Sequence, residues 1–128
     1  MTENIGPRRR ALVVEDDEDI RSSVEECLQS ADFETAGAPN GEAALAWLRA
    51  HDAPSLIVLD LMMPVMDGFD FRKAQLGDAR LATIPVLLLT ADGNVDKKCK
   101  DLGLTHGVKK PCDPGALVRA ADDACKAE

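Results

Sequence analysis

Apolar residues are concentrated in three short runs, at residues 11–14, 56–59 and 85–90. Each run is shorter than a typical helix and is apolar at nearly every position, which is the pattern of a strand buried on both faces of a sheet. Two less apolar segments, residues 33–37 and 106–110, predict a second strand and a weaker fifth strand. The hydrophobic pattern therefore predicts five strands.

The segments after these strands carry apolar residues at helical spacing, so a helix is predicted after each strand. The first helix has acidic residues in its first turn and an apolar stripe that starts at Ile20. Asn40 opens the second helix, and Gly103 ends the fourth. Asp67 and Asp113 are suited to the N-cap positions of the third and fifth helices.

Strands and helices that alternate in this way predict an α/β fold, in which helices cover both faces of a doubly wound, five-stranded parallel sheet. The chain has 128 residues, a length that fits one domain, so we expect a single domain over residues 1–128 with residues 1–8 as a loose lead. Met1 is consistent with a natural N-terminus, although a fragment of a longer protein is an alternative.

Composition argues against two classes of partner. The net charge of −8 and the aromatic content of 3% disfavour nucleic-acid binding, which uses basic patches and stacking rings. No apolar run approaches the roughly 20 residues that span a bilayer, so no membrane association is expected. The four cysteines form no C-x-x-C pair and no signal-like segment precedes them, which predicts reduced thiols in a cytoplasmic protein.

Polar side chains follow several of the predicted strands at the same end. These are Glu15 and Asp16 after the first strand, Asp60 after the third, Thr90 at the end of the fourth and Lys110 at the end of the fifth. In an open parallel sheet this edge is where ligands bind. Two carboxylates about 4 Å apart repel by about 4 kcal/mol at an effective dielectric of 20, and a divalent cation relieves that repulsion. An all-oxygen donor set suits magnesium or manganese.

A hydroxyl and an ammonium beside such a metal are suited to neutralising a phosphoryl group. Asp60 is then the candidate nucleophile, which would take the group as an acyl phosphate. Each feature has an ordinary alternative: the acids can cap a helix, Thr90 can be a turn residue and Lys110 a solvated strand end. Their common position at one edge of the sheet favours a site.

These residues lie in motifs that resemble the receiver domain of bacterial two-component response regulators. The motifs are Val13-Val14-Glu15-Asp16-Asp17, Leu59-Asp60-Leu61-Met62-Met63-Pro64 with Met66-Asp67-Gly68, Leu89-Thr90-Ala91 and Lys110-Pro111. They occur in the order of the family, and the resemblance covers essentially the whole chain. It implies a flavodoxin-like fold with strand order 2-1-3-4-5.

The resemblance also implies a role for each site residue. Asp60 would accept a phosphoryl group from a phosphohistidine on a sensor histidine kinase or histidine phosphotransfer protein. Asp16 and Asp60 would bind Mg2+ (or Mn2+) directly, together with the backbone carbonyl of Met62, and Glu15 would act through water.

The resemblance further implies contacts to the phosphoryl group, a cis peptide bond and the role of the domain. Thr90 and Lys110 would each contact a phosphoryl oxygen, and the Lys110–Pro111 bond would be cis. The module would be a signalling domain, not an enzyme, that assists its own phosphorylation and works alone or within a longer protein.

Two features depart from the family pattern. Gly107 stands where many relatives carry the Tyr or Phe that swings inward, so output would rest on Thr90, on backbone movement or on another face; His106 is a weaker substitute. Met62 and Asp92 occupy the two positions that often set the lifetime of the phosphate. The apolar Met62 cannot position an attacking water, which predicts slow self-dephosphorylation.

Three alternatives remain open at the level of sequence. The chain could be a pseudo-receiver that binds a partner without phosphorylation, which the missing aromatic favours but the intact set of Asp60, Asp16, Thr90 and Lys110 opposes. A haloacid-dehalogenase-type phosphohydrolase also uses a strand-end Asp, but it needs a second Asp where Met62 stands. Finally, a cluster of lysines would either be a solvated face or dock an acidic downstream partner; its members are Lys97, Lys98, Lys100 and Lys109.

Overall fold

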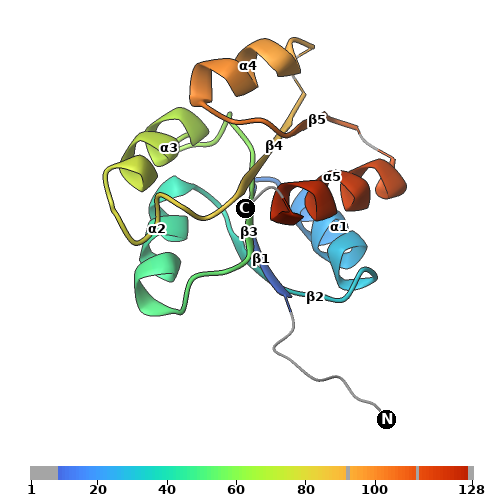
Figure 1. The fold of residues 1–128 in the computed structure, drawn as a ribbon, viewed down its shortest axis with the longest axis horizontal. Coiled ribbons are helices and arrows are strands. Elements are labelled where there is room, and N and C mark those ends of the chain that lie inside the picture. The colour runs from blue at the N-terminus through green and yellow to red at the C-terminus, as the bar shows by residue number, and fades with distance from the viewer. Residues whose placement is uncertain (1–8, 92, 112, 127–128) are drawn as a thin grey trace.

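The computed structural model describes residues 9–91, 93–111 and 113–126 (Figure 1). Five strands and five helices alternate along these described residues. The strands are β1 Arg9–Val14, β2 Phe33–Ala38, β3 Leu56–Leu59, β4 Val86–Thr90 and β5 Gly107–Lys109. The helices are α1 Glu18–Gln29, α2 Gly41–Ala50, α3 Gly68–Leu76, α4 Val95–Leu102 and α5 Pro114–Lys126.

All strand pairs are parallel, and the order across the sheet is β2-β1-β3-β4-β5. This confirms the predicted strand order. The register places Val14 beside Leu59, and Leu59 beside Leu88. The last residues of β1 and β3 therefore lie side by side, so the residues that follow them leave the sheet at the same edge.

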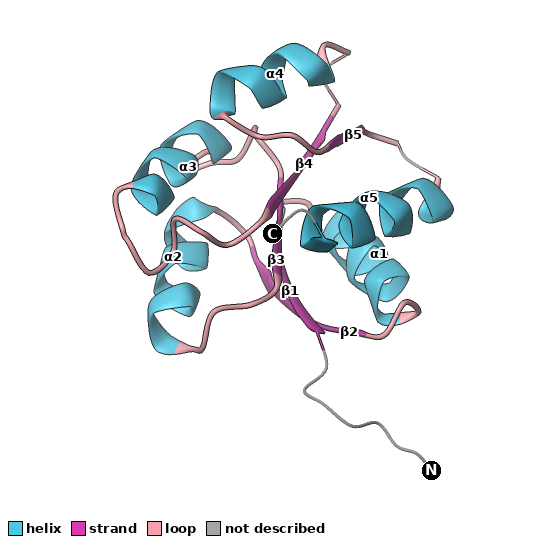
Figure 2. Cartoon of the chain, in the orientation of Figure 1, coloured by secondary structure: helices cyan, strands magenta, loops and turns pink. Residues whose placement is uncertain are grey.

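Helices cover both faces of the sheet, with α1 and α5 on one side and α2 and α3 on the other (Figures 1 and 2). Successive residues of β1 alternate between these layers, as side chains of a strand must. Ala11 and Val13 pack into the α1/α5 layer, whereas Leu12 and Val14 pack into the α2/α3 layer. A fully buried strand therefore needs apolar residues at every position, which explains the continuous runs in the sequence.

The helices are capped by residues that the sequence predicts. Asn40 accepts a hydrogen bond from the Ala43 amide at 2.8 Å, and Asp67 accepts one from the Asp70 amide at 2.9 Å. Gly103 ends α4 with a φ of 71°, a left-handed conformation that favours glycine. The N-cap of α1 is Asp17, which the sequence had suggested only as one of a group of acids.

The predicted boundaries are correct to within about two residues. β1 begins at Arg9 and β5 covers only residues 107–109. The predicted lead at residues 1–8, together with Asp92 and Cys112, lies outside the described residues. Cys27, Cys99 and Cys125 form no disulfide bond among the described residues. Among the described residues, no helix has the length and apolar character that crossing a membrane requires.

Candidate functional site

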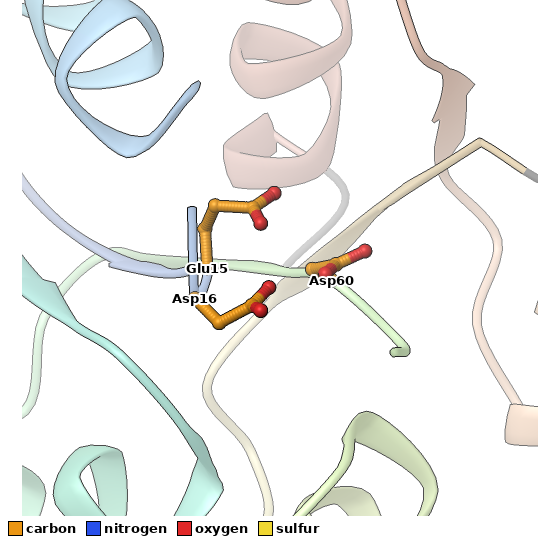
Figure 3. Close-up of side chains that lie close together, drawn as sticks. All are labelled: Glu15, Asp16 and Asp60. Carbon is orange, nitrogen blue, oxygen red and sulfur yellow. The ribbon is translucent and has the colours of Figure 1, made fainter. Parts of the chain in front are cut away.

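Three carboxylates meet at the carboxyl edge of the sheet (Figure 3). Glu15 and Asp16 follow β1 directly, and Asp60 follows β3; one oxygen from each lies within 4.8 Å of the others. Backbone hydrogen bonds hold them there, since the Glu15 amide donates to Ala38 O and the Asp60 amide donates to Val14 O, both at 3.0 Å. The pattern of backbone hydrogen bonds in the sheet thus continues one residue past β1 and β3, and it positions Glu15 and Asp60.

The three carboxylates differ in burial. Glu15 is 2% exposed and Asp60 is 5% exposed, whereas Asp16 is exposed to solvent. Burial disfavours the charged form and is the main reason why the pKa values of Glu15 and Asp60 are both raised. Two buried acids this close together need a cationic partner.

Lys110 is that partner. Its ammonium donates to Glu15 Oε1 at 2.6 Å and lies 3.4 Å from Asp60 Oδ1. Burial alone would lower the pKa of Lys110, but the hydrogen bond to Glu15 and the charge of Asp60 outweigh it and raise this pKa. The lysine is therefore an ammonium at neutral pH.

The backbone fixes Lys110 in place. Its amide donates to Thr90 O at 2.7 Å, which joins the ends of β4 and β5, and the Lys110–Pro111 peptide bond is cis as predicted. Thr90 is the last residue of β4, is 2% exposed and lies at the same edge of the sheet as the other polar residues. The structure thus brings together all four strand ends that the sequence had selected.

A cavity of about 320 Å³ opens above these groups. Its walls come from the segments that follow β1, β3 and β5, from the end of β4 and from the helices α1, α3 and α4. The lining residues are Glu15, Asp16, Asp17, Ile20, Asp60, Leu61, Met62, Phe69, Thr90, Ala91, Lys98 and Lys110. Asp60 lines this cavity although only 5% of the residue is exposed to solvent.

The donor set fits a hard divalent cation. The oxygens of Glu15, Asp16 and Asp60 are close enough to share one ion, and carboxylate oxygens are the ligands that magnesium and manganese prefer. Met62 lines the cavity while its side chain is 74% exposed. Its backbone carbonyl as a further ligand stays a prediction.

Side chains of α4 approach Gly107 closely, so a side chain at this position would require them to shift. A Cβ atom there would lie 2.5 Å from Cys99 Sγ and 2.7 Å from Val95 Cγ1. Helix α4 therefore packs directly against β5 at the position where the resemblance led us to expect an aromatic ring. His106 bonds to the neighbouring Thr105 hydroxyl at 2.9 Å.

The four lysines of the predicted basic cluster do not share one environment. Lys97 forms an ion pair with Asp101 at 3.1 Å, whereas Lys98 turns toward the cavity and lies over the Phe69 ring. Lys100 and Lys109 are exposed. Sequence reasoning did not associate Phe69 or Lys98 with the site, because their approach depends on how α3 and α4 pack and no motif signals it.

Comparison with known proteins shows to which family the chain belongs. The family model for the response regulator receiver domain matches residues 11–122. The chain belongs to this family. Receiver domains are signalling domains that interact with histidine kinases, and they generally use a divalent metal at their acidic pocket.

The chain is similar to the receiver portions of longer regulators. It is 36% identical over 109 residues to the response regulator Rre1 of Synechocystis, covering 83% of this chain and 47% of Rre1. It is 38% identical over 106 residues to RpaA of the same organism, a DNA-binding transcriptional regulator, covering 81% of this chain and 44% of RpaA. The chain thus spans less than half the length of these relatives.

Among solved structures, the receiver domain is similar to the chemotaxis response regulator CheY4 of Vibrio cholerae. The TM-score is 0.84 at 32% identity, and the match covers 92% of this chain and 99% of CheY4. The predicted receiver family and flavodoxin-like fold are therefore confirmed.

Proposed function

We propose that this receiver accepts a phosphoryl group on Asp60 from a phosphohistidine of a sensor histidine kinase or phosphotransfer protein, in a Mg2+-dependent reaction. The observation that carries the proposal is the position of Asp60, which lies close to two other acids, 3.4 Å from the partly buried Lys110 ammonium, and lines a cavity at the edge of the sheet. Phosphorylation then changes which partner the domain binds.

Each residue of the site has a separate role in the proposed reaction. An Asp60 carboxylate oxygen attacks phosphorus as the bond from phosphorus to the histidine nitrogen breaks, and the imidazole leaves with that electron pair. Lys110 balances charge on the phosphoryl oxygens, and the Thr90 hydroxyl donates to one of them. A magnesium ion held by Glu15, Asp16 and Asp60 would supply further charge neutralisation.

The test is incubation with phosphoramidate or acetyl phosphate and Mg2+, followed by intact mass. We expect a gain of one phosphoryl group that chelation of Mg2+ prevents and that Asp60→Asn abolishes, because an amide oxygen does not form the acyl phosphate. Asp67→Asn is the matched control, since Asp67 only caps α3 and should leave labelling intact. Equal labelling of the Asp60→Asn protein would contradict the proposal.

Self-dephosphorylation should be slow. Met62 offers no group that could orient a water molecule for attack on the acyl phosphate, and its side chain points largely into solvent. We expect Met62→Asn to shorten the lifetime by about tenfold, the rate effect of one hydrogen bond worth about 1.4 kcal/mol to the attacking water. Loss of the phosphoryl group followed by intact mass measures this. Asp92, the other position of this kind, lies outside the described residues.

A pseudo-receiver that acts as an interaction adaptor is the second candidate, because position 107 carries a glycine instead of the switch aromatic and Cys99 of α4 packs beside it. The labelling experiment separates the two, since an adaptor of this kind gains no phosphoryl group. In either case, residues 1–128 would be one receiver domain. Its output partner would be a protein, with the exposed lysines of α4 and β5 as a candidate contact.

A further inference from the structure

Arg21 of α1 contacts both ends of the short turn that carries Asp16. Its guanidinium Nη1 donates a hydrogen bond to Glu15 O at 2.9 Å, and its backbone amide donates to Asp17 O at 2.9 Å. Asp16 lies between these two acceptors in the chain. A single residue thus holds the turn of residues 15–17 from both sides.

Asp16 depends on this turn more than the other two acids of the site do. Glu15 and Asp60 are buried, and packing restricts their side chains. The Glu15 carboxylate also accepts hydrogen bonds from the Lys110 ammonium at 2.6 Å and from the Asp17 amide at 3.2 Å. Asp16 is exposed, yet its carboxylate points toward the same space as that of Asp60 (Figure 3). The backbone of the turn therefore has to set its direction.

Gly37 of the edge strand β2 leaves the space that the Arg21 side chain occupies. A Cβ atom at Gly37 would lie 2.9 Å from Arg21 Cδ and 3.1 Å from Arg21 Nε. It would also lie 2.7 Å from Glu25 Oε2, one turn further along α1. All three contacts are to flexible side chains, so a larger residue here would displace Arg21 and leave the backbone of the sheet in place.

The charge of Arg21 by itself opposes a metal ion. A guanidinium bonded to the chain beside these acids repels a divalent cation, so any benefit to metal binding must come from the geometry that it enforces. Fixing a ligand before the ion arrives removes the cost of ordering it on binding. The two effects have opposite signs, and a substitution of Arg21 separates them.

We propose that Arg21 is a positioning residue of the metal site, which fixes the turn of residues 15–17 so that the Asp16 carboxylate faces Asp60 before Mg2+ binds. The proposal rests on the metal-dependent phosphoacceptor function proposed above. Arg21 is not among the described residues that line the cavity, and it acts through the backbone of Glu15. Its effect is therefore on the affinity for Mg2+ and not on the reaction of the fully loaded protein.

The test is titration of Mg2+ into the 15N-labelled protein without a phosphoryl donor, followed by NMR. Arg21→Met should weaken Mg2+ binding by about three- to tenfold, the net effect of one hydrogen bond. If Arg21 acted only through its charge, the same variant would bind Mg2+ more tightly than the wild type. At saturating Mg2+, phosphoramidate should label Arg21→Met within about twofold of the wild-type rate, because the bound ion then orders the turn.

Gly37→Ala is the second variant, because it displaces the Arg21 side chain and keeps its charge. We expect it to weaken Mg2+ binding by about two- to tenfold. Combined with Arg21→Met, it should add less than about twofold to the loss, since both changes remove the same hydrogen bond. Arg49→Met is the matched control, because Arg49 is exposed in the last turn of α2; it should stay within about twofold of the wild type.

The outcomes separate the two proposals. If the wild type binds Mg2+ and gains no phosphoryl group, the phosphoacceptor function fails, whereas weaker Mg2+ binding by Arg21→Met still supports the positioning role. If the wild type is labelled and Arg21→Met binds Mg2+ as tightly or more tightly, the phosphoacceptor function stands and the role of Arg21 is overturned. An equal loss of affinity in Arg49→Met, or slow labelling of Arg21→Met at saturating Mg2+, would also overturn it.

Discussion

Gly68→Ala is expected to lower the free energy of unfolding by about 3 kcal/mol, at the upper end of the usual cost of overpacking. A Cβ atom at Gly68 would lie 2.5 Å from Asp60 O and 2.8 Å from Leu61 Cα. These are backbone atoms, which cannot rotate away as a side chain does. The Gly68 amide also donates to Leu61 O at 2.9 Å, so the start of α3 is joined to the segment that carries the phosphoacceptor.

Urea unfolding followed by circular dichroism measures this effect, and Gly77→Ala is the matched control. The nearest atoms to a Cβ at Gly77 are carbonyl oxygens at 3.6 Å, and its φ of −80° suits any residue. The control should be neutral or gain about 0.4–1 kcal/mol. Similar stability changes in the two variants would show that the contact at Gly68 relaxes without cost. Asp60 labelling should also slow in Gly68→Ala, because the carboxylate must shift.

The sequence predicted the parts of the structure that local rules determine. Continuous apolar runs identified the buried strands, and Asn40 and Asp67 cap helices where expected because N-capping depends on a few adjacent residues. The clustering of Asp60 with the other strand-end residues followed from one rule of parallel sheets, that their carboxyl ends meet at one edge.

Other features depend on how elements far apart in the sequence approach each other. The contact of Lys98 with Phe69 requires α4 to lie beside the start of α3, and no local pattern sets that distance. The close packing of Cys99 on Gly107 is of the same kind: the sequence showed a missing ring, but only the structure shows that α4 fills its place. The cis bond before Pro111 was expected from the family resemblance alone.

Lys110→Met is expected to destabilise the metal-free protein by about 3 kcal/mol at pH 8, since it leaves buried carboxylates without their cation. The Lys110 side chain is only 15% exposed, and its ammonium contacts both Glu15 and Asp60. Lys109→Met is the matched control, because Lys109 is exposed and immediately precedes Lys110, as the last residue of β5. It should change stability by less than about 0.5 kcal/mol.

The loss of folding stability caused by Lys110→Met should become smaller as the pH falls. Burial already raises the pKa values of Glu15 and Asp60 above their ordinary range in the folded protein, and removing the lysine raises them further. A carboxyl whose pKa is higher in the folded than in the unfolded protein binds more protons when the protein is folded. Its contribution to stability is therefore complete below the unfolded pKa, about 4, and is lost as the pH rises through the folded pKa.

We therefore expect the melting temperature of Lys110→Met to fall more steeply than that of the wild type between pH 5 and pH 8, in a chelating buffer. Adding Mg2+ should recover part of the loss at pH 8, because a divalent ion replaces the missing charge among the carboxylates. Melting curves with the same slope against pH for the two proteins would mean that Lys110 does not compensate the buried acids. The ammonium would then serve the phosphoryl group alone.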